Sequence, residues 1–295
     1  RFLFNAGQTP KAWNKKMLED KHLKVVYYTQ DSSKVFPNTD IKGGVAVTYR
    51  SVSNNFGAIE TFTHFEELNS MLIKTFEHTR ENNFSEIVFS RGEYSFTTRL
   101  FEDFPEARNL QGKGTGAKIT SASMGRMPFA FLESVNDENE YYKLLGRINN
   151  ERVYRWIKRE YIEKTLSLDK WNVLVPKANG SGALGEVLST PLIGQPLIGH
   201  TDTFLTIGAF DTELEAENCM KYIKSKFARA MLGVLKITQD NPKSVWKKIP
   251  LQDFTPNSDI DWTKSIPEID QQLYAKYGLS QDEIDFIEEK VKAME

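Results

Sequence analysis

The side chains in this chain whose types most clearly suggest a chemical function are cations, and they are concentrated in one part of the sequence. Every ionic residue from Lys221 to Lys248 is basic except Asp240, and acidic residues gather later, from Asp253 to Glu289. Lysine and arginine attract phosphate groups regardless of base sequence, so this separation predicts a phosphate-binding surface with an acidic far side. A solvated helix face is the alternative that the residues alone leave open.

Two glycine-rich segments carry further cations and small polar side chains. Residues 112–126 combine Gly, Ser and Thr with three cations, and residues 177–185 follow a strand that stops at Pro176. Backbone N–H groups in such a loop can cradle phosphate. Residues 112–126 lack the Gly-x-x-x-x-Gly-Lys-Ser/Thr spacing of a nucleotide-binding loop, which argues against an ATPase. A flexible loop without function is the alternative for this segment.

The sequence shows no motif for hydrolysis or for metal binding. The histidines are scattered without metal-ligand spacing, and the single cysteine, Cys219, excludes a disulfide framework and a multi-cysteine metal site. The strings nearest to nuclease spacing, Asp40–Lys42 and Glu288–Lys290, lack a convincing upstream aspartate, and no Ser-His-Asp or Cys-His arrangement stands out. The remaining enzymatic alternative is a hydrolase with a metal among Asp259, Asp261 and Glu268.

Periodic patterns predict the elements that position these side chains. Strands are predicted at residues 23–28, 45–50, 170–176 and 201–208. Residues 147–161 mix cations with apolar residues and predict an irregular amphipathic segment. Helices are predicted at residues 9–20 and 66–80, and at two capping boxes, Thr212 with Glu215 and Ser280 with Glu283. The apolar stripe of the helix from Thr212 leaves Lys221, Lys224 and Arg229 mostly facing outward.

An aromatic–proline loop, Val35-Phe36-Pro37, precedes a Gly-Gly pair and the strand at residues 45–50. With the helix and strand before it, this loop completes a βαβ-type fragment. The order resembles the end of the methyltransferase domain in adenine-specific DNA methyltransferases of restriction–modification systems, including enzymes fused to a nuclease. The resemblance implies that Phe36 stacks against the adenine flipped out of the duplex. An ordinary packed ring is the alternative.

The resemblance also implies what lies outside this sequence. The Asn-Pro-Pro-Tyr box of that family and its glycine-containing loop for S-adenosylmethionine do not occur here, and the chain opens at Arg1 inside an apolar run. We therefore expect a piece of a longer polypeptide that binds S-adenosylmethionine, and Mg²⁺ where a nuclease is fused. The chain itself is expected to hold no cofactor and no catalytic residue.

The second half resembles the target-recognition domain that follows the methyltransferase domain in the same family. The matching segments are Val175–Gly180, Lys226–Arg229, Lys236–Gln239 and Ile249–Phe254. Charge and resemblance together predict that cations hold the phosphates while Asn, Gln and Thr read base edges. The expected DNA contacts are Lys113, Lys118, Arg126, Lys177, Asn179, Ser181, Lys226, Arg229, Lys236, Thr238, Gln239, Lys243 and Lys247. Turn chemistry is the alternative for Thr238 and Gln239.

The expected fold class is α/β (α+β). Residues 1–52 are expected to be a remnant of a Rossmann-like methyltransferase sheet, residues 53–255 a mixed α+β target-recognition domain, and residues 256–295 a helical segment. The expected partners are double-stranded DNA and the methyltransferase or nuclease part of the same polypeptide. No apolar stretch reaches the length of about 18 residues that a membrane span needs, so a soluble protein is expected. The single cysteine is consistent with a reducing cytoplasm, and the resemblance implies a prokaryotic one. A protein-interaction scaffold without DNA contact is the alternative.

Overall fold

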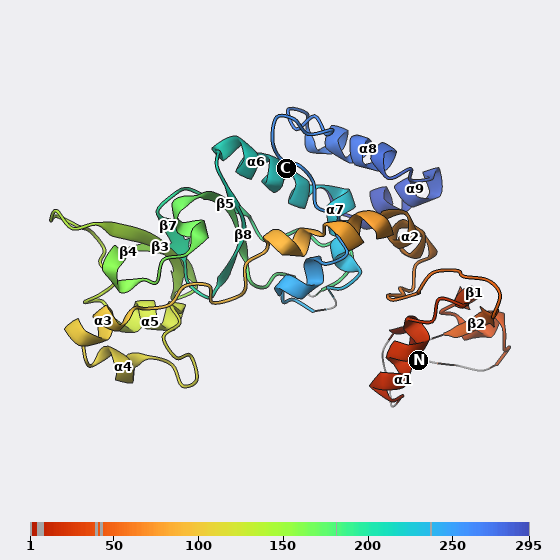
Figure 1. Ribbon diagram of the computed structural model, residues 1–295, viewed down its shortest axis with the longest axis horizontal. Helices are drawn as coiled ribbons and strands as arrows, with labels where there is room; N and C mark the ends of the chain where they lie inside the picture. The colour runs from red at the N-terminus through yellow and green to blue at the C-terminus, as the bar shows by residue number, and fades with distance from the viewer. Residues whose placement is uncertain are drawn as a thin grey trace. The chain divides into compact units, whose positions relative to one another are not determined.

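The computed structural model describes residues 2–4, 9–38, 41, 44–180, 182–236 and 238–294. The chain forms two compact units, residues 1–73 and residues 74–295 (Figure 1). Both contain helices and strands, so the protein is mixed α+β. This division does not fall at the boundaries expected from the sequence, after residues 52 and 255. Within the described residues, no helix has the length and apolarity needed to cross a bilayer.

The first unit is built on a short helix and a two-stranded hairpin. Helix α1 (Lys11–Leu18) precedes strand β1 (Leu23–Thr29), which pairs with β2 (Val45–Arg50). The pairing is antiparallel, so the βαβ-type fragment expected here was wrong. Strands joined directly by a loop on one edge pair antiparallel, whereas parallel pairing needs a long crossover between them. Helix α2 (Glu66–Glu81) crosses the division between the units.

The second unit contains two three-stranded sheets. In one, the order is β4 (Glu151–Lys158), β3 (Tyr141–Ile148) and β7 (Ile198–His200), with β3 antiparallel to β4 and parallel to β7. In the other, β5 (Trp171–Pro176) lies antiparallel between β6 (Leu192–Gly194) and β8 (Phe204–Phe210). The strand predicted at residues 170–176 is confirmed. The segment expected to be irregular at residues 147–161 is instead mostly regular β-hairpin.

The larger core of the second unit lies under one face of the β3–β4 hairpin. Tyr142, Leu144 and Ile157 point from that face into a cluster of buried apolar residues. The cluster includes Leu100 and Met124, from two of the short helices that cover this face: α3 (Thr98–Asp103), α4 (Ala107–Leu110) and α5 (Ser121–Arg126). Because successive strand residues alternate between faces, Lys143, Arg147 and Arg152 lie on the other face, whereas Arg155 shares the face of Leu144.

Four helices complete the second unit: α6 (Glu213–Lys224), α7 (Lys226–Gly233), α8 (Ile266–Lys276) and α9 (Gln281–Lys290). Figure 1 shows α6 beside β5 and β8, while α8 and α9 lie farther from these strands, against α6 and α7. Both predicted capping boxes, at Thr212 and at Ser280, are confirmed. The helix from Thr212 is interrupted at Ser225, whose hydroxyl caps α7 by accepting a bond from the Ala228 N–H.

Candidate nucleic-acid interface

Four loops that lie far apart in the sequence meet on one side of the second unit. The Asp202 N–H donates to the Ile119 carbonyl at 3.2 Å, and the Lys177 ammonium binds the Asp202 carboxylate at 3.1 Å. The Asn241 N–H donates to the Lys177 carbonyl at 2.8 Å. We call residues 118–121, 177–179, 201–203 and 238–241 the loop cluster. It brings together Lys118, Lys177, Asn179, Thr238 and Gln239, which the sequence had suggested separately.

A buried ammonium group holds two of these loops together. Lys236 is 6% exposed, and its Nζ donates to the carbonyls of Asn179 at 3.1 Å and Thr238 at 3.0 Å. Burial lowers the pKa of this amine. Between the same loops, the Asn179 N–H donates to the Gln239 carbonyl at 2.8 Å. Hydrogen bonds from the buried residues Lys236 and Asn179 therefore fix the backbone of Thr238 and Gln239, while both of these residues are exposed to solvent.

Asn179 belongs to this internal support. Its side-chain oxygen accepts from Asn241 Nδ2 at 2.6 Å, and its own Nδ2 donates to the Val187 carbonyl at 3.0 Å. Asn241 Nδ2 also donates to the Pro176 carbonyl at 3.0 Å. The amide that was expected to read a base is thus used within the protein, and Asn179 is buried. Lys236 and Asn179 are corrected from contacts to supports, because each buried polar group needs its internal partners.

Hydroxyl groups fasten the β3–β4 hairpin to the loop cluster. The Ser121 Oγ lies 2.7 Å from Thr201 Oγ1 and 3.2 Å from Thr203 Oγ1, and it accepts from the Arg147 N–H at 3.1 Å. The Ser121 N–H donates to the Asp202 carboxylate at 3.1 Å. The end of β3, where Arg147 lies, is therefore anchored beside the four loops.

His200 lies directly behind the loop cluster in the core. Its Nδ1 is 2.8 Å from the Thr201 carbonyl, and its Nε2 is 2.7 Å from Thr206 Oγ1. A carbonyl can only accept, so Nδ1 carries the hydrogen and Nε2 accepts from the threonine hydroxyl. Burial lowers the pKa of His200 to about 4. The imidazole is therefore neutral at pH 7 and serves as a spacer between strand β8 and the loop cluster.

The expected phosphate contacts divide into exposed and internal cations. Lys113, Lys118, Arg126, Lys243 and Lys247 are exposed. Such side chains cost little to bring against a phosphate, since they stay hydrated until contact and need not break an internal ion pair. Ser181 lies outside the described residues.

Two expected contacts on α7 are internal. Arg229 is 2% exposed and donates to the carbonyls of Lys224, Glu186 and Lys292, and burial lowers its pKa to about 10. The prediction that Arg229 faces outward was wrong, because α7 is buried nearly all round. Lys226 is held at 2.5 Å by the Glu288 carboxylate.

The outer face of the β3–β4 hairpin carries cations and rings that were not among the expected contacts. Lys143 lies opposite Trp156 in the register, and Arg147 lies opposite Arg152. The Lys143 Nζ is 4.9 Å from the ring centre of Tyr154 and 5.3 Å from that of Trp156. The sequence feature that could have predicted this surface is the Asn149-Asn150 turn. Both residues have positive φ, as the two-residue type I′ turn of a β-hairpin requires.

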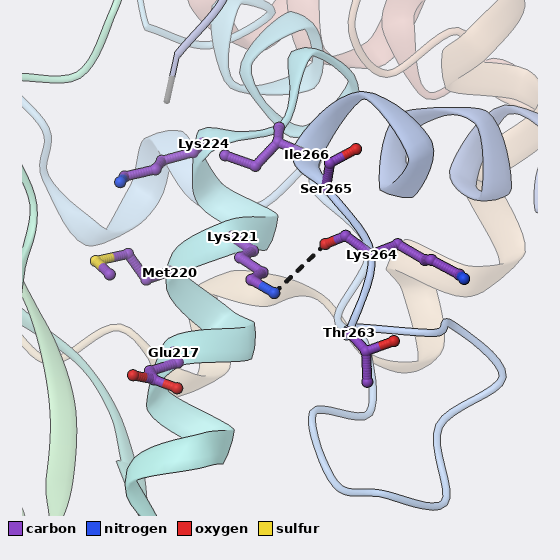
Figure 2. Close-up of a pocket in the computed structure, with 8 residues that line it drawn as sticks. All are labelled: Glu217, Met220, Lys221, Lys224, Thr263, Lys264, Ser265 and Ile266. Carbon is purple, nitrogen blue, oxygen red and sulfur yellow. Dashed lines mark hydrogen bonds between the residues drawn. The ribbon is translucent and has the colours of Figure 1, made fainter.

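A pocket of about 510 Å³ lies between α6 and residues 263–266. Lys221 closes part of it by donating to the carbonyls of Trp262 at 2.6 Å and Lys264 at 3.4 Å. Figure 2 shows the side chains of Lys224 and Lys264 pointing apart. The pocket therefore lacks a convergent charge, although three lysines line it.

The carboxylates proposed for a scattered metal site have separate local partners. Asp259 binds Lys276 at 2.8 Å, Asp261 accepts from the Thr263 hydroxyl at 2.6 Å, and Glu268 accepts from the hydroxyl of the α8 N-cap at 2.6 Å. Among the residues that the structure describes, no group of three or more His, Cys, Asp or Glu side chains is arranged to hold a metal ion.

In the first unit, Phe36 follows the short 3-10 helix Ser32–Lys34, and its side chain is 49% exposed. An exposed ring has a face to offer to a base, whereas a core ring does not. Asp40 and Lys42, considered above as part of a nuclease string, lie outside the described residues.

Neither a protein-family model nor a curated protein matches this sequence.

Proposed function

We propose that this chain is the DNA-recognition part of a restriction–modification adenine methyltransferase, and that residues 74–295 bind duplex DNA at the loop cluster. One observation carries the proposal: the exposed residues Thr238 and Gln239 lie in a loop whose backbone is held by hydrogen bonds from the buried Lys236 ammonium. A base-reading side chain must be held in a fixed position to discriminate between hydrogen-bonding patterns. A buried charge is costly, and here it fixes the backbone beneath two exposed polar side chains.

The residues then have distinct proposed roles. Lys113, Lys118, Lys243 and Lys247 contact phosphates, and Arg126 extends this set. Thr238 and Gln239 contact base edges. Lys177, paired with Asp202, positions the loops and does not compete for phosphate. This assignment separates affinity from specificity, because phosphate contacts fix the register and base contacts select the sequence.

For the first unit, the proposal follows the resemblance. Its hairpin would be the end of a Rossmann-like methyltransferase sheet, and the exposed Phe36 ring would stack against the flipped adenine. S-adenosylmethionine and the methyl-transfer residues would lie elsewhere in the parent polypeptide, together with Mg²⁺ where a nuclease is fused. The parent protein would act in the prokaryotic cytoplasm.

Salt dependence of duplex binding tests the phosphate contacts. We expect the affinity for a labelled mixed-sequence duplex, measured by fluorescence anisotropy, to fall linearly with salt on a double-logarithmic plot. Lys243→Ala and Lys247→Ala should each lower that slope by about 1. Lys264→Ala, at an exposed lysine that is not among the proposed phosphate contacts, is the matched control and should leave the slope unchanged. The absence of duplex binding at low salt would refute the proposal.

Selection from a random duplex pool tests the base contacts. The wild-type chain should enrich a defined sequence, and Gln239→Ala should lose preference at one position by about 1–3 kcal/mol. Its affinity for a non-selected duplex should be unchanged, since Gln239 carries no charge. An identical enriched sequence in the variant would place the base contacts elsewhere.

A further inference from the structure

We infer that the outer face of the β3–β4 hairpin binds unpaired nucleotides, with Tyr154 and Trp156 stacking against bases and Lys143, Arg147 and Arg152 holding the strand. The inference rests on the proposed DNA-recognition function and adds a substrate form to it. It concerns a surface separate from Thr238 and Gln239, so the two sites have separate tests.

The register assigns these five side chains to one face. Residues 143 and 147 of β3 pair with 156 and 152 of β4 without a bulge, and residue 154 shares their parity. This face carries no acidic side chain in either strand. Its central β3 residue, Leu145, is buried with Leu174 and Phe204 of the neighbouring sheet. The open part of the face therefore lies over β4, where Tyr154 is 40% exposed.

Lys143, Arg147 and Arg152 are uncompensated, whereas Lys158 at the far end of this face lies 3.9 Å from the Glu160 carboxylate. Lys143 lies over the two rings, Arg147 donates to the Asn150 carbonyl, and Arg152 donates to the Thr190 carbonyl. Within the described part of the chain, none of the three has a carboxylate in ion-pairing distance. On the opposite face, Arg155 is paired with Glu133 at 2.6 Å. The hairpin thus keeps its free positive charge on the side that presents the rings.

Aromatic rings beside unpaired cations favour binding of unpaired nucleotides over binding of a duplex. In a duplex, each base face is already stacked on its neighbours, so an aromatic side chain gains contact only with a base that is unpaired or flipped out. Tyr154 and Trp156 are two residues apart, which spaces them by about 7 Å along the strand. A base on each ring would leave the linking phosphate beside Lys143, whose ammonium lies within reach of both rings.

The experiment compares labelled single-stranded oligo(dT) with a mixed-sequence duplex of the same length. Tyr154→Leu should weaken oligo(dT) binding by about tenfold, the loss expected for one base–aromatic stack, and Tyr154→Trp should retain binding. Lys143→Gln should reduce the salt dependence of oligo(dT) binding. Leu166→Ala, at an exposed apolar residue of the same unit, is the control. Oligonucleotides carrying 5-iodouracil should photocrosslink to the peptide containing Tyr154.

The outcomes separate this inference from the proposed function. Loss of oligo(dT) binding in Tyr154→Leu with duplex binding within about twofold of wild type supports the inference, because the stack contributes only to unpaired bases. Oligo(dT) binding without any duplex binding would overturn the duplex role of the loop cluster and leave this inference standing. Equal oligo(dT) affinity in wild type and Tyr154→Leu, or an equal loss for duplex and single strand, would overturn the inference.

Discussion

Replacing Lys236 with methionine tests whether a buried ammonium holds the loop cluster in place. Methionine keeps an unbranched apolar stem of similar length and removes the charge and its donors. The side chain is 6% exposed, and its two acceptors, the carbonyls of Asn179 and Thr238, lie in different loops. The variant therefore leaves two carbonyls without their partner and removes one of the links between the two loops, which keep the bonds from Asn179 to Gln239 and Asn241.

The size of the effect follows from those two bonds. A hydrogen bond to a charged group contributes about 1.5–3 kcal/mol. Because burial already disfavours the charged amine and lowers its pKa, the lower figure applies to each bond. Two bonds then give a loss of about 3 kcal/mol in the free energy of unfolding. Lys243→Met, at an exposed lysine nearby, should change it by less than about 0.5 kcal/mol.

The assay is urea unfolding of the full chain followed by tryptophan fluorescence, with amide hydrogen exchange as a second readout. In Lys236→Met, the amide of Asn241, which donates to the Lys177 carbonyl, should exchange faster because its loop loses the link through the ammonium to the Asn179 carbonyl. If Lys236→Met is as stable as wild type and protects the Asn241 amide equally, the ammonium does not support the loops, and the main argument for Thr238 and Gln239 falls.

Two further predictions concern the framework around the loop cluster. His200 has a pKa of about 4 in the folded protein, below its ordinary 6.5, so between these values only the unfolded chain takes up the proton and stability falls with falling pH, by at most about 3 kcal/mol. Burial raises the pKa of Asp270 to about 6, which adds stability as the pH falls and is common to wild type and His200→Gln, so on going from pH 7 to pH 4.5 the urea midpoint of wild type should fall relative to that of His200→Gln; the same change in both proteins would contradict a neutral buried His200. Gly185 has a φ of +77°, and an added Cβ would collide with the Lys290 carbonyl oxygen, whereas Gly114 has a φ of +79° with open space around it. Gly185→Ala should therefore destabilise by more than the roughly 1–2 kcal/mol expected for Gly114→Ala from backbone strain alone, as measured by thermal unfolding, and equal losses would mean that the chain near Lys290 moves aside freely.

Local signals in the sequence identified several elements because those elements depend on short-range chemistry. The capping boxes at Thr212 and Ser280 begin α6 and α9. The apolar run before Pro176 is β5. Each of these signals acts within a few residues, where side-chain to backbone hydrogen bonds and strand propensity decide the outcome.

The orientation of Arg229 could not be predicted from such local signals. Periodicity continued from α6 places it outside the apolar stripe, but the chain breaks at Ser225 and α7 lies inside the domain. Its guanidinium is satisfied by carbonyls of residues 186, 224 and 292, two of them distant in sequence. A buried cation of this kind depends on acceptors that only the tertiary fold supplies, and the periodicity of apolar residues in the sequence does not identify those acceptors.

For the loop cluster, the sequence indicated which residues come together but not which of them are buried. Asn179, Lys236 and Gln239 were selected for their residue types, and the structure does bring them together. It divides them by depth: Lys236 and Asn179 are buried, and Gln239 is exposed. Residue type alone indicates which groups can form hydrogen bonds, but whether the partner is protein or DNA depends on burial.

The β3–β4 hairpin differs, because its sequence does contain the information that separates its cations. Asn149-Asn150 is suited to a two-residue turn with positive φ at both positions, and such a turn fixes Ile148 opposite Glu151. Counting outward from that pair places Arg147 with Arg152 and Lys143 with Trp156, and leaves Glu151 on the other face. Arg152 shares a face with the two rings through alternation within β4, and a shift of one residue in the pairing would move Lys143 and Arg147 to the other face, so the turn decides that these two cations join the rings.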